Sequence, residues 1–297
     1  MVAVFSGQRR SLQLLDLVLL AAVIGLAGFA CYRISAYLHY TWNWSAIPQF
    51  LWRYDQIQHR WVANYLLEGL LTTIRLSCWS GVLALILGLL LALLRTGRSL
   101  YGYLLARSFI ELMRNLPPLV IIFLVYFFLA DQLLPLIGFD TQILHSPIWQ
   151  SDAVRLLLAP PGQLEPFVSA VITLAIFESA YVAEIIRAGV ASVEQSQWDA
   201  AHALGLTRTQ CLRHVILPQA FRRIMPPLAG QMISLIKDSA IVSVISIQEL
   251  TYQATQLMAS TFLTIEVWLT VAALYFVLTW PCALAVNALD RRLNRRM

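Results

Sequence analysis

Six apolar stretches, each about as long as a membrane-spanning helix, constrain the fold of this chain more than any other feature. A helix needs about 20 mostly apolar residues to cross the hydrocarbon core of a bilayer. The stretches cover approximately residues 14–38, 69–94, 116–137, 166–189, 228–248 and 264–287. The fifth is the least apolar because Lys237 and Asp238 interrupt it, and residues 248–262 after it are predicted as a short external helix. The pattern predicts an all-α membrane protein with about six transmembrane helices.

The composition agrees with membrane insertion and excludes two soluble classes. Charged residues make up 12% of the chain, which is about half of the roughly 25% that is typical of soluble domains. That leaves too little polar surface to cover a soluble enzyme of 297 residues. The net charge is +5, but the basic residues are dispersed between the apolar stretches and form no single patch, which argues against nucleic-acid binding.

Arginines occupy alternate gaps between the apolar stretches, and this fixes the predicted orientation. One set of gaps holds Arg9, Arg10, Arg95, Arg98, Arg107, Arg114, Arg208, Arg213, Arg222, Arg223, Arg291, Arg292, Arg295 and Arg296. The opposite gaps hold only Arg53, Arg60 and Arg155. Because basic residues are retained on the cytoplasmic side, both termini are predicted to be cytoplasmic.

The two outer gaps differ from the inner ones in composition. Residues 39–64 contain six tryptophans and tyrosines, which suits an aromatic belt at the membrane–water interface. Residues 138–165 carry the prolines and glycine of a loop. The first apolar stretch is longer than the apolar region of a signal peptide and is predicted to remain as an uncleaved span.

The single lysine of the sequence, Lys237, argues against an ATP-binding site in this chain. A P-loop needs Gly-Lys-Ser/Thr, whereas Ile236 precedes the lysine and Asp238 follows it. The sequence also lacks the serine-hydrolase and zinc-peptidase motifs, and its four cysteines are too scattered for a metal site or a disulfide framework. We therefore predict that the chain is not an enzyme, binds no metal, and depends on another chain for any ATP hydrolysis.

Between the fourth and fifth stretches, residues 191–222 have the sequence of two short helices joined by a turn. The segment Asp199-Ala200-Ala201 gives the first helix a small surface that another protein can approach closely. Gly205 permits a positive φ and ends this helix, and Leu206 makes the hydrophobic contact that closes the turn. Pro218 breaks the second helix or begins the next one. Such a projecting unit suits insertion into a groove of a partner protein.

The order of residues in this loop resembles the coupling loop of ABC importer permeases. That loop reads Glu-Ala-Ala, three residues, Gly, nine residues, Ile, one residue, Leu-Pro. The chain keeps every interval, with Asp199 in place of Glu, Val215 in place of Ile, and Leu217-Pro218 at the end. Further segments resemble the polar amino-acid uptake family of these permeases (the histidine, glutamine, glutamate and arginine type). They are 69–77, 111–119, 181–189 and 237–245.

The resemblance implies a type I importer fold with a five-helix core. On this interpretation residues 65–290 form the transmembrane domain, and residues 1–64 add an extra N-terminal span and an aromatic-rich external segment. A basic cytoplasmic tail, 291–297, follows. The external insertion at 131–165 is longer than is usual in the family.

The resemblance also implies a function and partners. The chain would be the permease subunit of an ATP-driven, binding-protein-dependent importer of polar amino acids in the bacterial cytoplasmic (inner) membrane. It would work with a second permease subunit, identical or a sister chain, with an ABC ATPase dimer that binds ATP and Mg, and with a periplasmic or extracellular amino-acid-binding protein. It would bind no cofactor itself. The alternative is an ion-driven secondary transporter or channel without an ATPase, which would leave the coupling loop unexplained.

Polar residues inside the predicted spans are candidates for the transport pathway. A charge at a helix centre costs about 2.5–3.5 kcal/mol, so such residues usually face a cavity or a partner. Glu178 is nearest the middle of its span and suits a substrate ammonium group, whereas Arg75 suits a carboxylate. The substrate-binding candidates are Glu178, Ser179, Tyr181, Thr72, Thr73 and Arg75. The charges predicted to form structural or gating ion pairs are Glu111, Arg114, Glu184, Arg187, Lys237 and Asp238.

Overall fold

A computed structural model describes residues 14–37, 40–57, 59–97, 99–130, 132, 157–159 and 163–294. The chain divides into two compact units, residues 1–43 and 44–297. The first unit contains one helix, α1 (Leu14–Tyr37), which coincides with the first apolar stretch. Its apolar part among the described residues is Asp16–Leu26.

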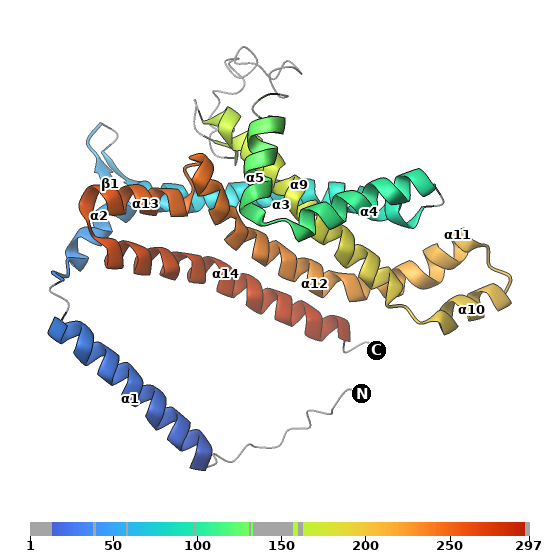
Figure 1. Ribbon diagram of the computed structural model, residues 1–297, viewed down its shortest axis with the longest axis horizontal. Coiled ribbons are helices and arrows are strands. Elements are labelled where there is room, and N and C mark those ends of the chain that lie inside the picture. Colours follow the sequence, from blue (N-terminus) through green and yellow to red (C-terminus); the bar gives the residue numbers. More distant parts are fainter. Residues whose placement is uncertain are drawn as a thin grey trace. The chain divides into compact units, whose positions relative to one another are not determined.

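The second unit is mainly helical (Figure 1). Its elements are η1 (Trp44–Ala46), α2 (Ile47–Leu51), β1 (Trp52–Asp55), β2 (Arg60–Ala63), α3 (Tyr65–Thr96), α4 (Leu100–Asn115), α5 (Pro118–Leu124), the π-helix η2 (Val125–Ala130), α9 (Leu164–Ala191), α10 (Gln195–Ala203), α11 (Arg208–Cys211), the π-helix η4 (Leu212–Ile216), α12 (Leu217–Asp238), the 3-10 helix η5 (Ser239–Ile245), α13 (Leu250–Thr261) and α14 (Thr264–Asn294).

Four helical segments among the described residues are long and apolar enough to cross a membrane. They are Tyr65–Thr96, Leu164–Ala191, Arg208–Ile245 and Thr264–Arg292. A fifth span is obtained if α4 and α5, which meet at an angle of 120°, count together. The second, fourth and sixth predicted stretches are therefore confirmed as long apolar helices. The helix predicted at 248–262 is confirmed as α13, whereas its external location stays a prediction.

Helix α9 is the most enclosed of these segments, with 61% of its most apolar window buried, compared with 6% for α14. It packs along α3 through small residues, among them Ala84 and Gly88 of α3 and Ala175 of α9. Small residues let two helix backbones approach closely in a membrane protein. Polar side chains on the inward face of α9 are therefore surrounded by protein, which is what a buried charge requires.

Helix α4 lies between the second and third apolar stretches. From its arginines, this region was predicted only as a cytoplasmic gap, without a helix. Helix α4 buries Gly102, Ala106, Ile110 and Met113, which recur at the spacing of one helix face. Ser99 begins the helix by accepting a hydrogen bond from the Gly102 amide. In the third predicted stretch, 116–137, residues 118–130 and residue 132 are helical, residues 116 and 117 precede the helix, and residues 131 and 133–137 lie outside the described residues.

The fifth span starts earlier than the predicted residue 228. The chain is helical without a break from Arg208 to Ile245. Pro218 lies in the first turn of α12, and the π-helix η4 immediately precedes it. Proline has no N–H to donate within a helix. The wider π turn before it changes the backbone hydrogen-bond pattern at the point where this donor is missing. Pro226 and Pro227 lie inside α12 itself.

The predicted all-α class holds for most of the second unit, which is mainly helical, but its start contains a two-stranded hairpin that was not predicted. Strands β1 and β2 pair antiparallel, with Trp52 opposite Ala63 and Tyr54 opposite Trp61. Three of the six aromatic residues that suggested an interfacial belt, Trp52, Tyr54 and Trp61, lie on these strands next to charged residues, which is the pattern of a two-faced hairpin.

Candidate functional site

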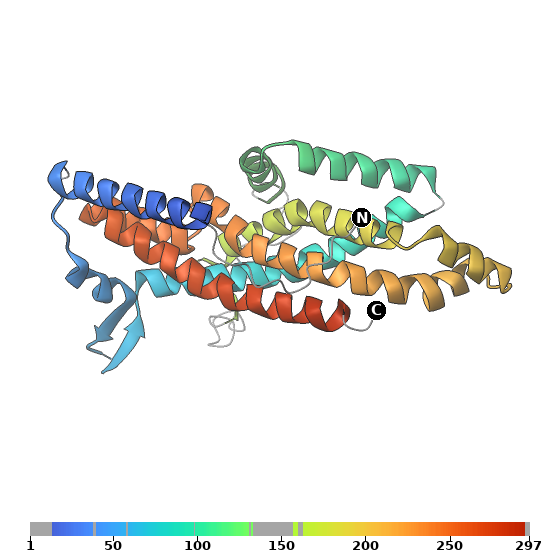
Figure 2. The same cartoon turned by 90° about the horizontal axis from the view of Figure 1, so that it is seen from below.

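The loop between α9 and α12 folds into a compact helix–turn–helix unit, here called the coupling knob (residues 195–220). It lies at the end of the second unit opposite to α13 and the β-hairpin (Figures 1 and 2). Gly205 has φ +76°, and its amide donates to the His202 carbonyl at 2.9 Å, while the Leu206 amide donates to the Ala201 carbonyl at 3.2 Å. This pair of bonds is the Schellman ending of a helix. The predicted positive φ at Gly205 is confirmed.

The second helix of the knob begins with a reciprocal cap. The Gln210 amide donates to Thr207 Oγ1 at 3.4 Å, and the Thr207 amide donates to Gln210 Oε1 at 2.9 Å. Our sequence prediction did not include this capping box, although the Thr-x-x-Gln spacing is its signature. The two motifs together fix the turn between α10 and α11 on both sides.

The interior of the knob is apolar. Ala201, Cys211 and Ile216 are buried in it, and Leu206 and Val215 pack against them. Ala201 had been predicted on the approachable surface, but it is only 2% exposed because its face of α10 is turned toward the second helix. The predicted hydrophobic contact of Leu206 is confirmed.

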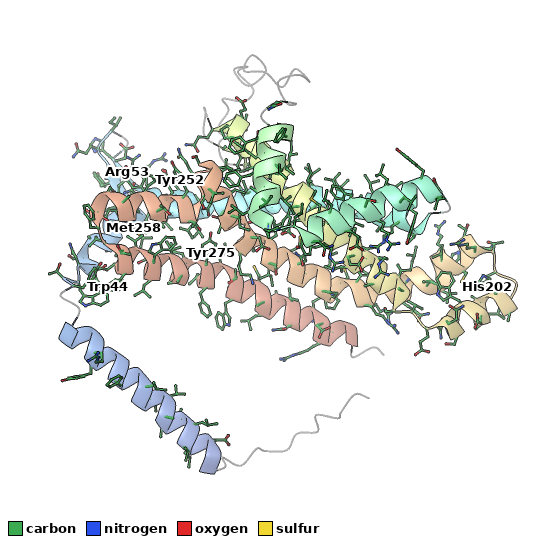
Figure 3. The ribbon with its side chains drawn as sticks, in the orientation of Figure 1. Trp44, Arg53, His202, Tyr252, Met258 and Tyr275 are labelled. Atoms are coloured by element: carbon green, nitrogen blue, oxygen red, sulfur yellow. The ribbon has the colours of Figure 1, made fainter. Side chains whose placement is uncertain are left out.

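The outer surface of the knob carries Asp199, Ala200 and Leu204. Leu204 is 81% exposed, and sequence reasoning missed it even though it directly precedes Gly205. Leu217 and Pro218 are also exposed, at the junction of the knob with α12. His202 marks the position of this surface in Figure 3. A large apolar side chain held at the tip of a rigid turn is suited to enter a groove of a partner.

A second polar site is buried between α9 and α12. Glu178 is fully buried, and its Oε2 accepts a hydrogen bond of 2.8 Å from the Gln231 side chain. The Asp238 carboxyl is close enough to the Glu178 carboxyl to interact with it electrostatically. Glu178 Oε1 has no hydrogen-bond partner. A buried acceptor without a partner is costly, so this atom is available to a donor that enters the site.

Two other substrate-binding candidates on α9, Ser179 and Tyr181, differ in whether their side chains are free to contact a ligand. Tyr181 is half-buried and packs edge-on against Phe177, with 5.3 Å between the ring centroids. The Ser179 hydroxyl donates to the Ile176 carbonyl at 2.7 Å, within its own helix. Tyr181 is thus placed one turn from Glu178, whereas Ser179 is already satisfied by the backbone.

The candidates on α3 do not form one site. Thr72 donates to the Glu68 carbonyl at 3.0 Å and borders a cavity of about 150 Å³. Thr73 is fully buried and donates to Glu249 Oε2 at 3.3 Å. Arg75 is half-buried. Thr73 therefore belongs to a structural network around Glu249 rather than to a ligand-facing surface.

Glu249 is the polar residue that sequence reasoning missed. It is fully buried at the start of α13, where its Oε1 accepts from the Tyr252 amide at 2.8 Å. Tyr275 of α14 donates to its Oε2 at 3.0 Å, and Figure 3 labels Tyr252 and Tyr275 on their two helices. Burial raises the pKa of Glu249 to about 7, although the hydrogen bonds to the carboxylate oppose the shift. Its side chain caps α13, although glutamate is not one of the residues usually preferred at this position, so the sequence contained no clear signal of the cap.

A cluster of charges links α3, α4 and α9. Glu184 accepts from Arg187 at 2.5 Å and from Arg95 at 2.6 Å, and Arg114 lies 3.9 Å away. The predicted pairing of Glu184 with Arg187 is confirmed, and the other two arginines extend it. Glu111 stays exposed, and its carboxylate accepts from the side chain of the neighbouring Asn115 at 3.3 Å.

Lys237 and Asp238 form no direct ion pair in the part of the chain that the structure describes. Lys237 is exposed, whereas Asp238 is half-buried and interacts electrostatically with Glu178. Adjacent residues on a helix point in different directions, which explains the difference from the predicted strut. Among the described residues, no group of three His, Cys, Asp or Glu side chains is placed to hold a metal ion.

Comparison with known proteins settles the family. The sequence pattern of the binding-protein-dependent transport system inner membrane component matches residues 84–297. The chain belongs to this family. The family is that of ABC importer permeases, so the chain is a permease subunit and the secondary-transporter alternative is not favoured. The matched range includes the coupling knob and Glu178, and it excludes the β-hairpin.

Two relatives and one solved structure support this assignment. The glutamine transport system permease protein GlnP of Escherichia coli (strain K12) is 35% identical over 232 residues, which are 78% of this chain and 92% of that protein. The glutamate/aspartate import permease protein GltK of Escherichia coli O6:H1 is 30% identical over 253 residues, which are 85% of this chain and 99% of that protein. The crystal structure of an amino acid ABC transporter with histidines has a TM-score of 0.66 and 31% identity, covering 85% of this chain and all of that one.

Proposed function

We propose that this permease subunit carries polar amino acids across the bacterial inner membrane in an ATP-driven importer supplied by a binding protein. The coupling knob carries the proposal, because its exposed Leu204 is held beside a glycine-ended turn. A rigid apolar tip of this kind fits a cleft in a partner and can pass on the movement of that partner. The names of the relatives, which refer to glutamine, glutamate and aspartate, support an amino-acid substrate.

The proposed assembly has two permease subunits, identical or sister chains, above an ABC ATPase dimer that binds ATP and Mg. The knob faces the cytoplasm, as the arginine distribution favours, and both termini lie on the same side. With α1 as an extra span, the chain crosses the membrane about six times. The binding protein docks at the opposite end of the spans.

Within the pathway, we propose Glu178 as the group that receives a substrate ammonium. Its unpartnered Oε1 and the neighbouring Gln231 and Asp238 support this role. Tyr181 lies one turn away, and Arg75 on α3 suits a substrate carboxylate. Glu178→Gln should strongly reduce uptake while leaving membrane insertion intact. Ser179→Ala is the matched control, because that hydroxyl donates only to its own helix backbone.

Association with the ATPase is the decisive test. The detergent-solubilised chain should co-purify with an ABC ATPase, and proteoliposomes should take up amino acid only with ATP and the binding protein. Leu204→Asp should abolish both the association and the uptake, because it places a charge in an apolar cleft. Gln256→Asp, at an exposed position on α13 and at the opposite end of the second unit from the knob, should leave the association with the ATPase unchanged. Uptake driven by an ion gradient without any ATPase would overturn the proposal.

A further inference from the structure

The β-hairpin at the start of the second unit has two chemically different faces. In an antiparallel pair, residues directly opposite each other project to the same side of the sheet. The register places Trp52, Tyr54 and Trp61 on one face. It places Arg53, Asp55, Arg60 and Val62 on the other. The hairpin lies outside residues 84–297, so the family assignment gives it no role.

The aromatic face is not covered by the rest of the second unit. Trp52 is 51% exposed, Tyr54 49% and Trp61 67%. Tyr54 and Trp61 pack edge to face, with 5.6 Å between their ring centroids. The three side chains line an open groove of about 1000 Å³, whose other walls include Phe50 and Tyr65. Arg53 also reaches this groove, so a cationic group lies beside the aromatic walls.

The hairpin is fixed at the end of the spans. Phe50 and Ile47 of α2 pack into an apolar core that contains residues of α13 and α14. The Asn64 amide donates to the Leu51 carbonyl at 2.9 Å, which closes the base of the hairpin. Helix α3 then begins at Tyr65, two residues after β2 ends. The hairpin is therefore held at the level where the second predicted stretch enters the membrane.

The direction of the hairpin is across the spans rather than along them. In Figures 1 and 2 the hairpin leaves the end of α3 sideways, in two views at right angles. Figure 3 labels Arg53 on this projection. An element that leaves a span sideways at its membrane entry runs along the bilayer surface. A protein that docks from outside would approach along the spans, so the location favours lipid as the occupant.

We propose that the hairpin is an interfacial anchor that binds phospholipid headgroups. The aromatic face lies at the boundary between headgroups and acyl chains, where tryptophan and tyrosine rings are most stable. Arg53 pairs with a phosphate at the groove. The charged face, with Arg60, stays in the aqueous headgroup layer. The hairpin lies in the outer leaflet if the knob faces the cytoplasm, and this part of the proposal rests on the proposed function. The contact of the hairpin with lipid does not depend on that orientation.

Site-directed spin labelling tests the proposal face by face. The four native cysteines are replaced by alanine, and single cysteines are introduced as Trp61→Cys or Arg60→Cys. These two positions are adjacent on β2 and lie on opposite faces. The labelled full-length chain is placed in nanodiscs of phosphatidylethanolamine and phosphatidylglycerol, without ATPase or binding protein. Collision rates with oxygen, which concentrates in lipid, are compared with those of a water-soluble nickel chelate.

The expected result is opposite behaviour at the two positions. The label at 61 should collide several-fold more often with oxygen than with the chelate, and the label at 60 should show the reverse. Tyr54→Cys and Asp55→Cys repeat the comparison on β1, in case one variant disturbs the hairpin. Equal access of the chelate to both faces would overturn the proposal. So would a label at 61 that is accessible to the chelate until the binding protein is added, since the face would then dock protein. Neither result depends on transport, so the proposed function can stand or fail separately.

Discussion

Replacing Gly88 with alanine should loosen the contact between α3 and α9. A Cβ atom at this position would lie 2.5 Å from Val182 Cγ1, 2.6 Å from Val182 Cβ and 3.0 Å from the Ser179 carbonyl oxygen. Favourable contacts between carbon atoms lie at about 3.5–4.0 Å, so the first two distances are about 1 Å too short. Val182 can rotate its Cγ1 away, but its Cβ moves only with the α9 backbone. The helices must therefore separate, at a cost of about 1–3 kcal/mol.

Two other glycines provide matched controls. At Gly81 the added methyl would meet Met232 Sδ at 3.2 Å and Leu235 Cδ2 at 3.3 Å. Both atoms are at the ends of flexible side chains and can move by a few tenths of an ångström. At Gly230, inside α12, nothing lies within 4 Å. Gly230→Ala should leave stability unchanged or raise it by up to about 1 kcal/mol, because alanine favours a helix over glycine.

Thermal unfolding of the purified chain in one detergent measures all three variants. The Gly88→Ala midpoint should fall by several degrees, Gly81→Ala should show a smaller change, and Gly230→Ala should match or exceed the parent chain. Adding Val182→Ala to Gly88→Ala removes the Cγ1 contact but keeps the Cβ contact, so it should restore only part of the loss. A Gly88→Ala chain as stable as Gly230→Ala would refute the close packing of α3 on α9.

Three further predictions concern charge and the knob. Burial raises the pKa of Glu249 to about 7 from the ordinary value of 4.5. As pH rises from 4.5 to 7, the Glu249 carboxyl therefore loses its proton in the unfolded chain before it does so in the folded chain, and the free energy of unfolding should fall by up to about 3 kcal/mol. Glu249→Gln should remove this slope from the pH profile of thermal stability, and an unchanged profile would contradict the raised pKa of Glu249. Glu184→Gln leaves three arginines without their carboxylate and should cost about 1–3 kcal/mol of stability, whereas Glu111→Gln, at an exposed position, should cost little in the same melting assay. Gly205→Ala should weaken ATP-coupled uptake more than Gly205→Asn, because asparagine tolerates a positive φ better. The space around Gly205 is open, so the Gly205→Trp chain should insert into the membrane normally yet uncouple ATP hydrolysis from uptake. Normal uptake by this variant would disprove the role of the turn.

Long apolar runs and turn chemistry were the parts of this protein that could be predicted from sequence. The runs located α3, α9 and α14 because a bilayer demands an uninterrupted apolar length. The turn at Gly205 was predictable because only a residue that accepts a positive φ suits the end of α10. In both cases the determining interaction is local or is made with the solvent.

The hairpin and α4 were missed because their signals are weak or conflict with another pattern. Strand β1 and strand β2 are joined by residues 56–59, which contain no glycine, asparagine or aspartate to mark a hairpin turn. In α4, arginines suggested a cytoplasmic loop, while the buried face starts with the small residues Gly102 and Ala106, which give little apolar contrast. The buried network around Glu249 could not be predicted from sequence, because its partners are far away along the chain. Thr73 is 176 residues and Tyr275 is 26 residues from Glu249.

The continuity of two helices explains how the knob and the buried polar site can act together. Helix α9 carries Glu178 and ends just before the knob, and the helical segment that leaves the knob carries Gln231 and Asp238. A helix rises about 1.5 Å per residue, so the helical path from Arg208 to Gln231 is about 35 Å long. Pro226 and Pro227 lie between the two sites on α12, where the missing amide donors weaken the helix ladder. We therefore expect movement of the knob to bend α12 at these prolines and to change the separation of Gln231 from Glu178, which makes or breaks the hydrogen bond between them.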